Sequence, residues 1–151
     1  NPNRCDVEPV LFLDNCKLAI VHVIKDLGVT IDPLLKFNAH IDNIIGKARS
    51  RSGLILRSFK SRNRNNLFRA FVVYARPLLE YCSPVWSPHY KYAIDKLESV
   101  QRRFTKRLPG MSGIEYSNRL LLLNIDSLER RRIVADLVTL YKIVYIHMNV
   151  N

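Results

Sequence analysis

Residues 37–60 read FNAHIDNIIGKARSRSGLILRSFK, and their apolar side chains return every three or four positions or at multiples of that spacing. The stripe holds Phe37, Ile41, Ile44, Ala48, Ile55 and Phe59, with basic residues between them. Such a period predicts an amphipathic helix over about 37–60, with its apolar side in a core. The basic residues ring the polar side of the helix instead of forming one stripe.

Three short apolar runs precede this helix. They cover residues 10–13, 18–24 and 27–31, and polar pairs at Asp14-Asn15 and Lys25-Asp26 separate them. Runs rich in β-branched residues and bounded by turn signals predict strands. A ribbon of two or three strands is marginal alone, so we expect helices or a neighbouring sheet to cover its apolar face.

Further helices are expected on the carboxyl side. Asn65-Asn66 opens one, and the prolines at 84 and 88 should break any helix between them. Ser87-Pro88 is a cap followed by proline, which predicts the start of a helix that ends near Leu108. Ser112 and Glu115 have the spacing of a capping box.

The last predicted helix is capped by Asp126, and four of its apolar residues form one stripe: Ile133, Leu137, Leu140 and Val144. The predicted fold class is therefore α+β. A short antiparallel β segment at 1–32 precedes a mainly α-helical bundle at 33–151.

The helix at about 89–108 has the most clearly separated sides. At 100° per residue, an arc of about 120° forms its predicted buried face: Ile94, Leu97, Val100, Gln101, Phe104 and Leu108. The predicted polar side holds Arg102, Arg103 and Lys106, with Arg107 at its edge and Asp95 and Glu98 one or two turns earlier. Cations in a last turn also stabilise the helix dipole, which explains Lys106 and Arg107 better than Arg102 and Arg103.

The charge is concentrated in the middle of the chain. The 151 residues include 24 Lys+Arg and 13 Asp+Glu, a formal net charge of +11. Residues 36–107 hold sixteen basic and four acidic residues, whereas residues 1–35 hold three and five. Such a basic field is typical of a protein that binds a polyanion, and the alternative is a solvated surface rich in lysine and arginine.

Composition and motifs exclude several classes of protein. A hydrophobic content of 48% excludes disorder, and no apolar run approaches the roughly 18 residues that span a bilayer. Three distant cysteines exclude a disulfide scaffold and favour a reducing, intracellular compartment. No Gly-rich phosphate loop, H-E-x-x-H motif or adjacent aspartate pair occurs, so we expect no catalytic residue, metal ligand or cofactor in this segment. The scattered histidines, His40 among them at the polar edge of its helix, are expected to be surface or packing residues.

Two stretches carry a family likeness. Residues 25–32 read KDLGVTID, and residues 76–88 read RPLLEYCSPVWSP. Together with VQRRFTK at 100–106, they resemble the C-terminal palm and thumb of non-LTR (LINE-type, jockey-like) retrotransposon reverse transcriptases. The likeness covers about 25–145 in the family's order, and 76–88 is its most specific part.

The resemblance implies a fragment of an RNA-directed DNA polymerase from a transposable element. The strands near 25–31 would correspond to a primer-grip hairpin at the end of the palm, and the helices from 33 onward to a thumb. The implied partners are an RNA template, an RNA–DNA hybrid and the missing palm and fingers, with no membrane and no small-molecule substrate. The implied location is the nucleus and cytoplasm.

The family's catalytic aspartates precede this region, and the parent polymerase would need Mg²⁺. We therefore expect no polymerase activity from this chain alone. The first residue, Asn rather than Met, also suggests a fragment.

The candidate nucleic-acid contacts are Lys25, Gly28, Lys47, Arg51, Arg102, Arg103 and Lys106. Gly28 either admits a nucleic-acid backbone or marks a bend in a strand. Tyr81 and Trp86 either stack on nucleotides or form a packed joint between helices. The alternative function is a non-catalytic basic helical module that binds nucleic acid or an acidic protein.

Overall fold

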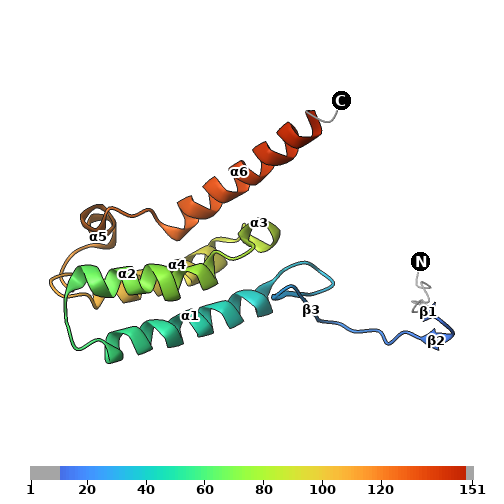
Figure 1. Cartoon of the computed structure of the whole chain (residues 1–151), viewed down its shortest axis with the longest axis horizontal. Helices are drawn as coiled ribbons and strands as arrows, with labels where there is room; N and C mark the ends of the chain where they lie inside the picture. Colours follow the sequence, from blue (N-terminus) through green and yellow to red (C-terminus); the bar gives the residue numbers. More distant parts are fainter. Residues whose placement is uncertain (1–10, 149–151) are drawn as a thin grey trace, which may run out of the picture.

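The computed structural model describes residues 11–148 and has the α+β architecture, with two small hairpins followed by a helical bundle. The strands are β1 (Phe12–Leu13), β2 (Cys16–Lys17), β3 (Ile24–Asp26) and β4 (Val29–Ile31). The helices are α1 (Asn38–Ser58), α2 (Arg64–Tyr74), the 3₁₀ helix η1 (Arg76–Leu79), α3 (Ser83–Trp86), α4 (Lys91–Lys106), α5 (Tyr116–Leu123) and α6 (Leu128–Met148). Figure 1 shows α1 packed beside α2 and α4, while α6 rises away from them at an angle.

The expected strand at 18–24 is wrong for most of its length. Residues 18–23 form no strand, and only Ile24 belongs to β3. The β1–β2 hairpin closes just before this stretch, where the Leu18 amide donates to the Leu11 carbonyl at 2.8 Å. Among the described residues no third strand runs beside 18–23, so its backbone has no sheet partner. β1 and β2 therefore lie far out from the helices, as Figure 1 shows.

The β3–β4 hairpin has a two-residue turn. Its register pairs Lys25 with Thr30 and Asp26 with Val29, so Leu27 and Gly28 form the loop. Both have positive φ, 45° and 89° respectively. This is the pattern of the type I′ turns that match the twist of hairpin strands, and glycine adopts it without strain. Gly28 therefore lies in the bend between two strands, which is the structural interpretation of this glycine.

Three side chains attach this hairpin to the helices. Val29 is buried in the core, and the Tyr81 hydroxyl donates to the Leu27 carbonyl at 3.1 Å. His40, at the start of α1, accepts a hydrogen bond from the Thr30 amide at Nδ1, at 3.2 Å. The placement of His40 at a polar edge is wrong, because its ring is buried edge-on against Trp86 with 5.3 Å between centroids.

The His40 contact makes the stability of the fold depend on pH. Burial, with a smaller effect of nearby Lys47, holds the pKa of His40 below its ordinary value. The unfolded chain takes up the proton near pH 6.5, and the folded chain does so only at lower pH. The free energy of unfolding should therefore fall as pH drops below about 6.5 and level off below the folded pKa.

Urea unfolding between pH 7.5 and 5 would measure this dependence. The His40→Gln variant should lose much of it, while a His89→Gln control should retain it. A His40→Gln variant with the wild-type pH profile would contradict this role for His40.

The core lies between α1, α2 and α4. The middle of the predicted stripe of α1 is confirmed, since Ile41, Ile44, Ala48 and Ile55 are all buried. Its ends are not, because Phe37 is half-buried and Phe59 is exposed, each just outside the helix. The rings of Phe71 and Phe104 stack with centroids 4.4 Å apart, which joins α2 to α4.

Trp86 lies where the β3–β4 hairpin meets the helices, between His40 of α1 and the segment that contains Tyr81. Its side chain is 1% exposed, and its Nε1–H donates to the Tyr81 carbonyl at 2.7 Å. The packing interpretation of Trp86 is therefore confirmed, whereas the Tyr81 ring is more than half exposed.

Helix boundaries differ from the expected ones at three places. Pro84 does not break a helix but lies in the first turn of α3, where its missing N–H costs nothing. α4 begins at Lys91, after Tyr90, instead of at Ser87-Pro88. α5 begins at Tyr116 after Glu115, with no side-chain cap, so the capping box at 112–115 is not formed. Glu115 itself occupies the cap position of α5, so the helix begins three residues later than the box requires.

The start of α6 is capped from another helix. Asp126 does not cap it but pairs with Arg130, whose amide bonds to the Ser127 hydroxyl at 3.2 Å. The amides of Leu128 and Glu129 donate to the Glu98 carboxylate of α4 at 3.3 and 3.2 Å. None of the helices within residues 11–148 is long and apolar enough to cross a membrane.

The helical wheel placed Glu98 on the polar surface of α4, and this prediction is wrong. It is 5% exposed and also accepts a hydrogen bond from the Tyr116 hydroxyl of α5. Burial and this bond raise the pKa of Tyr116, so the hydroxyl stays protonated as a donor. One carboxylate thus fastens α4, α5 and α6 together.

Candidate nucleic-acid interface

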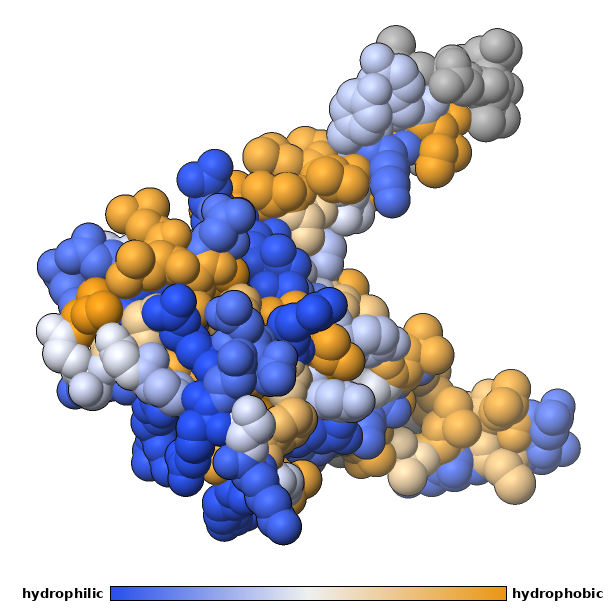
Figure 2. Space-filling model, turned by 60° about the vertical axis from the view of Figure 1, so that its left-hand side comes forward, coloured by the Kyte–Doolittle hydropathy of each residue, from blue (hydrophilic) through white to orange (hydrophobic). Residues whose placement is uncertain are grey.

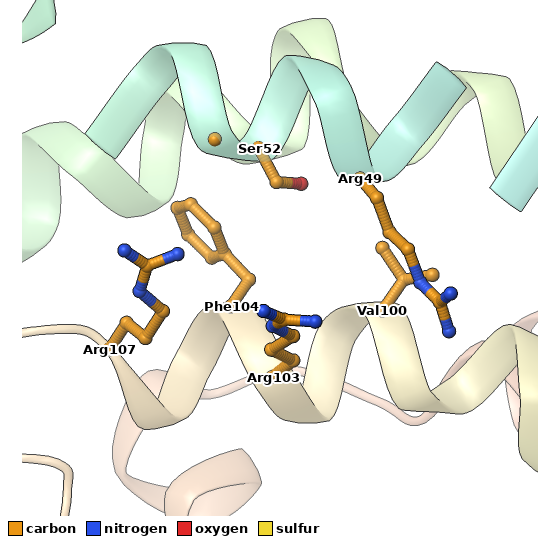
Figure 3. A pocket seen from close by; sticks show the side chains of 7 residues that line it. Arg49, Ser52, Val100, Arg103, Phe104 and Arg107 are labelled. Carbon is orange, nitrogen blue, oxygen red and sulfur yellow. The ribbon is translucent and has the colours of Figure 1, made fainter. Parts of the chain in front are cut away.

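A basic hollow of about 220 Å³ lies between α1 and α4. We call it the α1–α4 hollow, and its lining is Arg49, Ser52, Gly53, Val100, Arg103, Phe104 and Arg107. Figure 3 shows Phe104 and Arg103 rising from α4 toward Ser52, with Arg107 on one side and Arg49 on the other. The hollow therefore has an apolar floor and guanidinium groups around it.

Neighbouring contacts fix the spacing of the two helices here. The Arg49 guanidinium donates to the Ser99 hydroxyl at 3.0 Å, and Asp42 forms an ion pair with Lys96 one to two turns away. Ser52 turns its hydroxyl back to the Ala48 carbonyl, at 2.6 Å, so it offers no donor to the hollow. A Cβ added to Gly53 would have no atom within 4 Å, so the absent side chain leaves that wall open.

The charge of the hollow is uncompensated. Its lining contains three arginines and no acidic residue. Within residues 11–148, no carboxylate lies within 4 Å of the guanidinium groups of Arg49, Arg103 or Arg107. Arginine stays protonated at all physiological pH, so this is a permanent positive site.

The structure divides the three predicted contacts on α4. Arg102, Arg103 and Lys106 are all exposed, as expected, but only Arg103 lines the hollow. The Arg102 guanidinium lies 5.1 Å from the ring centre of Tyr116, on the α5 side. Lys106 is one turn beyond Arg102 on that same side of the helix.

The two predicted contacts on α1 lie away from the hollow. Taking 100° per residue, Lys47 and Arg51 lie about 160° around the helix from Arg49. Both are exposed, and Arg51 borders a separate apolar hollow with Leu54 and Tyr74 beside α2. The structure therefore does not bring Lys47 and Arg51 together with Arg103.

The remaining predicted contacts are on the β3–β4 hairpin. Lys25 is exposed on β3, and Gly28 is exposed in the turn beside the Tyr81 ring. Neither residue lines the α1–α4 hollow.

Sequence reasoning missed two residues of the hollow, Arg49 and Arg107. Arg107 is four residues after Arg103 and therefore on the same side of α4, a signal the sequence contains. Arg49 shares a side of α1 with Asp42 and Gly53, but nothing in the sequence says that this side faces α4.

No three His, Cys, Asp or Glu side chains in the described part of the chain lie close enough together to hold a metal ion.

Comparison with known proteins gives one distant relative. The chain is 30% identical over 130 residues to "Uncharacterized protein B0403.1" of Caenorhabditis elegans. The match covers 84% of this chain and 66% of that protein, just under two thirds of its length. No family model matches the chain, and no solved structure matches it.

Proposed function

We propose that this chain is the palm-end and thumb segment of a non-LTR retrotransposon reverse transcriptase, and that it binds the template–primer duplex through its phosphates. The motif at 76–88 supports the family, and its residues build the joint that connects the hairpin with the helices. The activity of a whole polymerase, RNA as its template, and the nucleus and cytoplasm as its location belong to the same proposal.

The α1–α4 hollow is the observation that carries the proposal. Three guanidinium groups without carboxylate partners surround a small cavity that opens on the surface. Guanidinium groups form paired, charge-assisted hydrogen bonds to phosphate oxygens, and the apolar floor made by Val100 and Phe104 strengthens them by excluding water. The oxygens of a phosphodiester match the arginine fork.

The other predicted contacts lie outside the hollow and would contribute less to binding. Arg102 and Lys106, on the next side of α4, add to the field that attracts the duplex. Lys25 and Gly28 lie on the hairpin that the resemblance assigns to the primer's 3′ end, and Tyr81 fixes that hairpin to the helices.

The nuclease-treated chain should bind an RNA–DNA hybrid with an affinity that falls as salt rises. If it contacts several phosphates, the plot of log affinity against log salt should have a slope of about −0.9 for each one, as on B-form DNA. Fluorescence anisotropy between roughly 50 and 200 mM salt would measure this slope. Hybrids of scrambled sequence should bind equally well, because backbone contacts carry no sequence information.

An acidic polypeptide of matched charge density serves as the competing ligand. Binding to that polypeptide without any affinity for the hybrid would overturn the proposal.

A further inference from the structure

The outward side of α6 is apolar. Taking 100° per residue, seven of its exposed apolar side chains lie within half of its circumference and are between 45% and 60% exposed: Ile133, Val134, Leu137, Leu140, Tyr141, Ile143 and Val144. Figure 2 shows apolar side chains gathered along the arm that α6 forms. Contiguous apolar surface of this extent marks an interaction site in a water-exposed protein.

The inward side of α6 is more polar than the outward side. α6 packs on α3 and α4, and Leu128 and Arg132 are buried there, with Asp136 and Thr139 half-buried. The usual amphipathic arrangement is thus inverted. The bundle of this chain does not cover the apolar side of α6.

The apolar side has the spacing of a helix-pairing seam. Ile133, Leu137, Leu140 and Val144 follow one another by four, three and four residues and lie within about 60° of arc. The order four-three-four is the same in both directions along the helix. An antiparallel copy therefore aligns with it, with Leu137 of one copy facing Leu140 of the other, and Ile133 facing Val144.

Charge favours a second copy in that orientation. Residues 133–146 contain one acidic residue, Asp136, and one basic residue, Lys142, so the seam is neutral in a chain of net charge +11. The basic segment 36–107 lies at the amino-terminal end of α6, as Figure 1 shows. Antiparallel pairing places the two basic bundles at opposite ends, whereas parallel pairing would bring them together.

The available area is that of a weak dimer. A large apolar or aromatic side chain offers on the order of 150 Å² or more, and the seven residues of this face are about half exposed. Covering this face in two copies would bury roughly 1,000 Å², the size of a weak interface. We propose that α6 pairs antiparallel with α6 of a second copy of this chain, through Ile133, Leu137, Leu140 and Val144.

Sedimentation equilibrium of the nuclease-treated, full-length chain at 0.3 M salt tests this proposal. At about 50 µM the expected mass is twice that of the chain. The dimer should dissociate on dilution toward the micromolar range, as expected of a small interface. The Leu137→Glu/Leu140→Glu variant should be monomeric and folded, since both positions face solvent in the single chain. A matched control on α5, Leu121→Glu/Leu122→Glu, should remain dimeric.

A charge-swapped variant tests the orientation. In Leu137→Glu/Leu140→Lys, the antiparallel pairing places each new carboxylate opposite a new ammonium group, so the dimer should return. Parallel pairing would instead oppose like charges. A monomeric wild-type chain, a dimer that survives in Leu137→Glu/Leu140→Glu, or a monomeric Leu137→Glu/Leu140→Lys variant would each overturn the proposal.

Discussion

Replacing Glu98 by alanine is expected to lower the free energy of unfolding by about 3–5 kcal/mol, the range for breaking a buried charged network. The substitution leaves the amides of Leu128 and Glu129 and the Tyr116 hydroxyl without their common acceptor. It also removes the carboxylate that interacts most strongly with the buried Arg132 guanidinium, whose pKa is lowered by its burial. The melting temperature should drop by roughly 10 °C or more.

The Glu98→Gln variant is the matched control. Its side-chain carbonyl can still accept from Tyr116 or one amide of α6, so we expect about half the loss. Thermal unfolding by circular dichroism would measure both variants. A Glu98→Ala variant within about 0.5 kcal/mol of the wild type, the range of ordinary surface substitutions, would show that this carboxylate does not fasten α6.

Replacing Trp86 by alanine is the second large expected effect, at about 3–5 kcal/mol. The indole is 1% exposed and contacts the His40 ring, so its loss leaves a cavity where α1 meets α3. The β3–β4 hairpin should loosen as well, because His40 and Tyr81 attach it and both contact Trp86. Hydrogen exchange at the Thr30 amide would report this loosening.

The Trp86→Phe variant separates packing from hydrogen bonding. It keeps most of the volume and loses the bond to the Tyr81 carbonyl, so its loss should be about 1–2 kcal/mol. An unchanged exchange rate at Thr30 in Trp86→Ala would contradict the coupling between the joint and the hairpin.

Helical periodicity predicted the core side of α4 well. Leu97, Val100, Gln101 and Phe104 are buried, because a period of 3.6 residues determines which side chains share a face. Of the other two predicted members, Ile94 is half-buried, and Leu108 is buried but lies after the end of α4. The same periodicity placed Glu98 on the surface, since it assumes that a charged side chain is solvated. The groups that bury Glu98 lie eighteen and thirty residues further along the chain, in Tyr116 and Leu128.

The limits of the sequence are clearest on α6 and in the α1–α4 hollow. Periodicity identified the stripe of α6 that includes Leu137, but it could not show that Arg132, on the other side, packs inward. Arg103 was identified from α4 alone. Its grouping with Arg49 depends on how α1 packs on α4, which helix-by-helix patterns do not contain.

Under the proposed function, the α1–α4 hollow holds phosphates of a template–primer duplex. Two double variants with the same loss of charge on α4 test it most directly: Arg103→Gln/Arg107→Gln in the hollow and Arg102→Gln/Lys106→Gln on the α5 side. Glutamine nearly keeps the helix propensity of the residues it replaces, so both variants should remain folded.

The measurement is the salt dependence of RNA–DNA hybrid binding by the wild type and the two variants. We predict that the slope of log affinity against log salt becomes shallower by about 0.9 per lost contact in Arg103→Gln/Arg107→Gln, close to 2 in total, with a hybrid roughly comparable to B-form DNA. The slope of Arg102→Gln/Lys106→Gln should change by well under half as much. Equal changes in the two variants, or an unchanged slope in Arg103→Gln/Arg107→Gln, would contradict the claim.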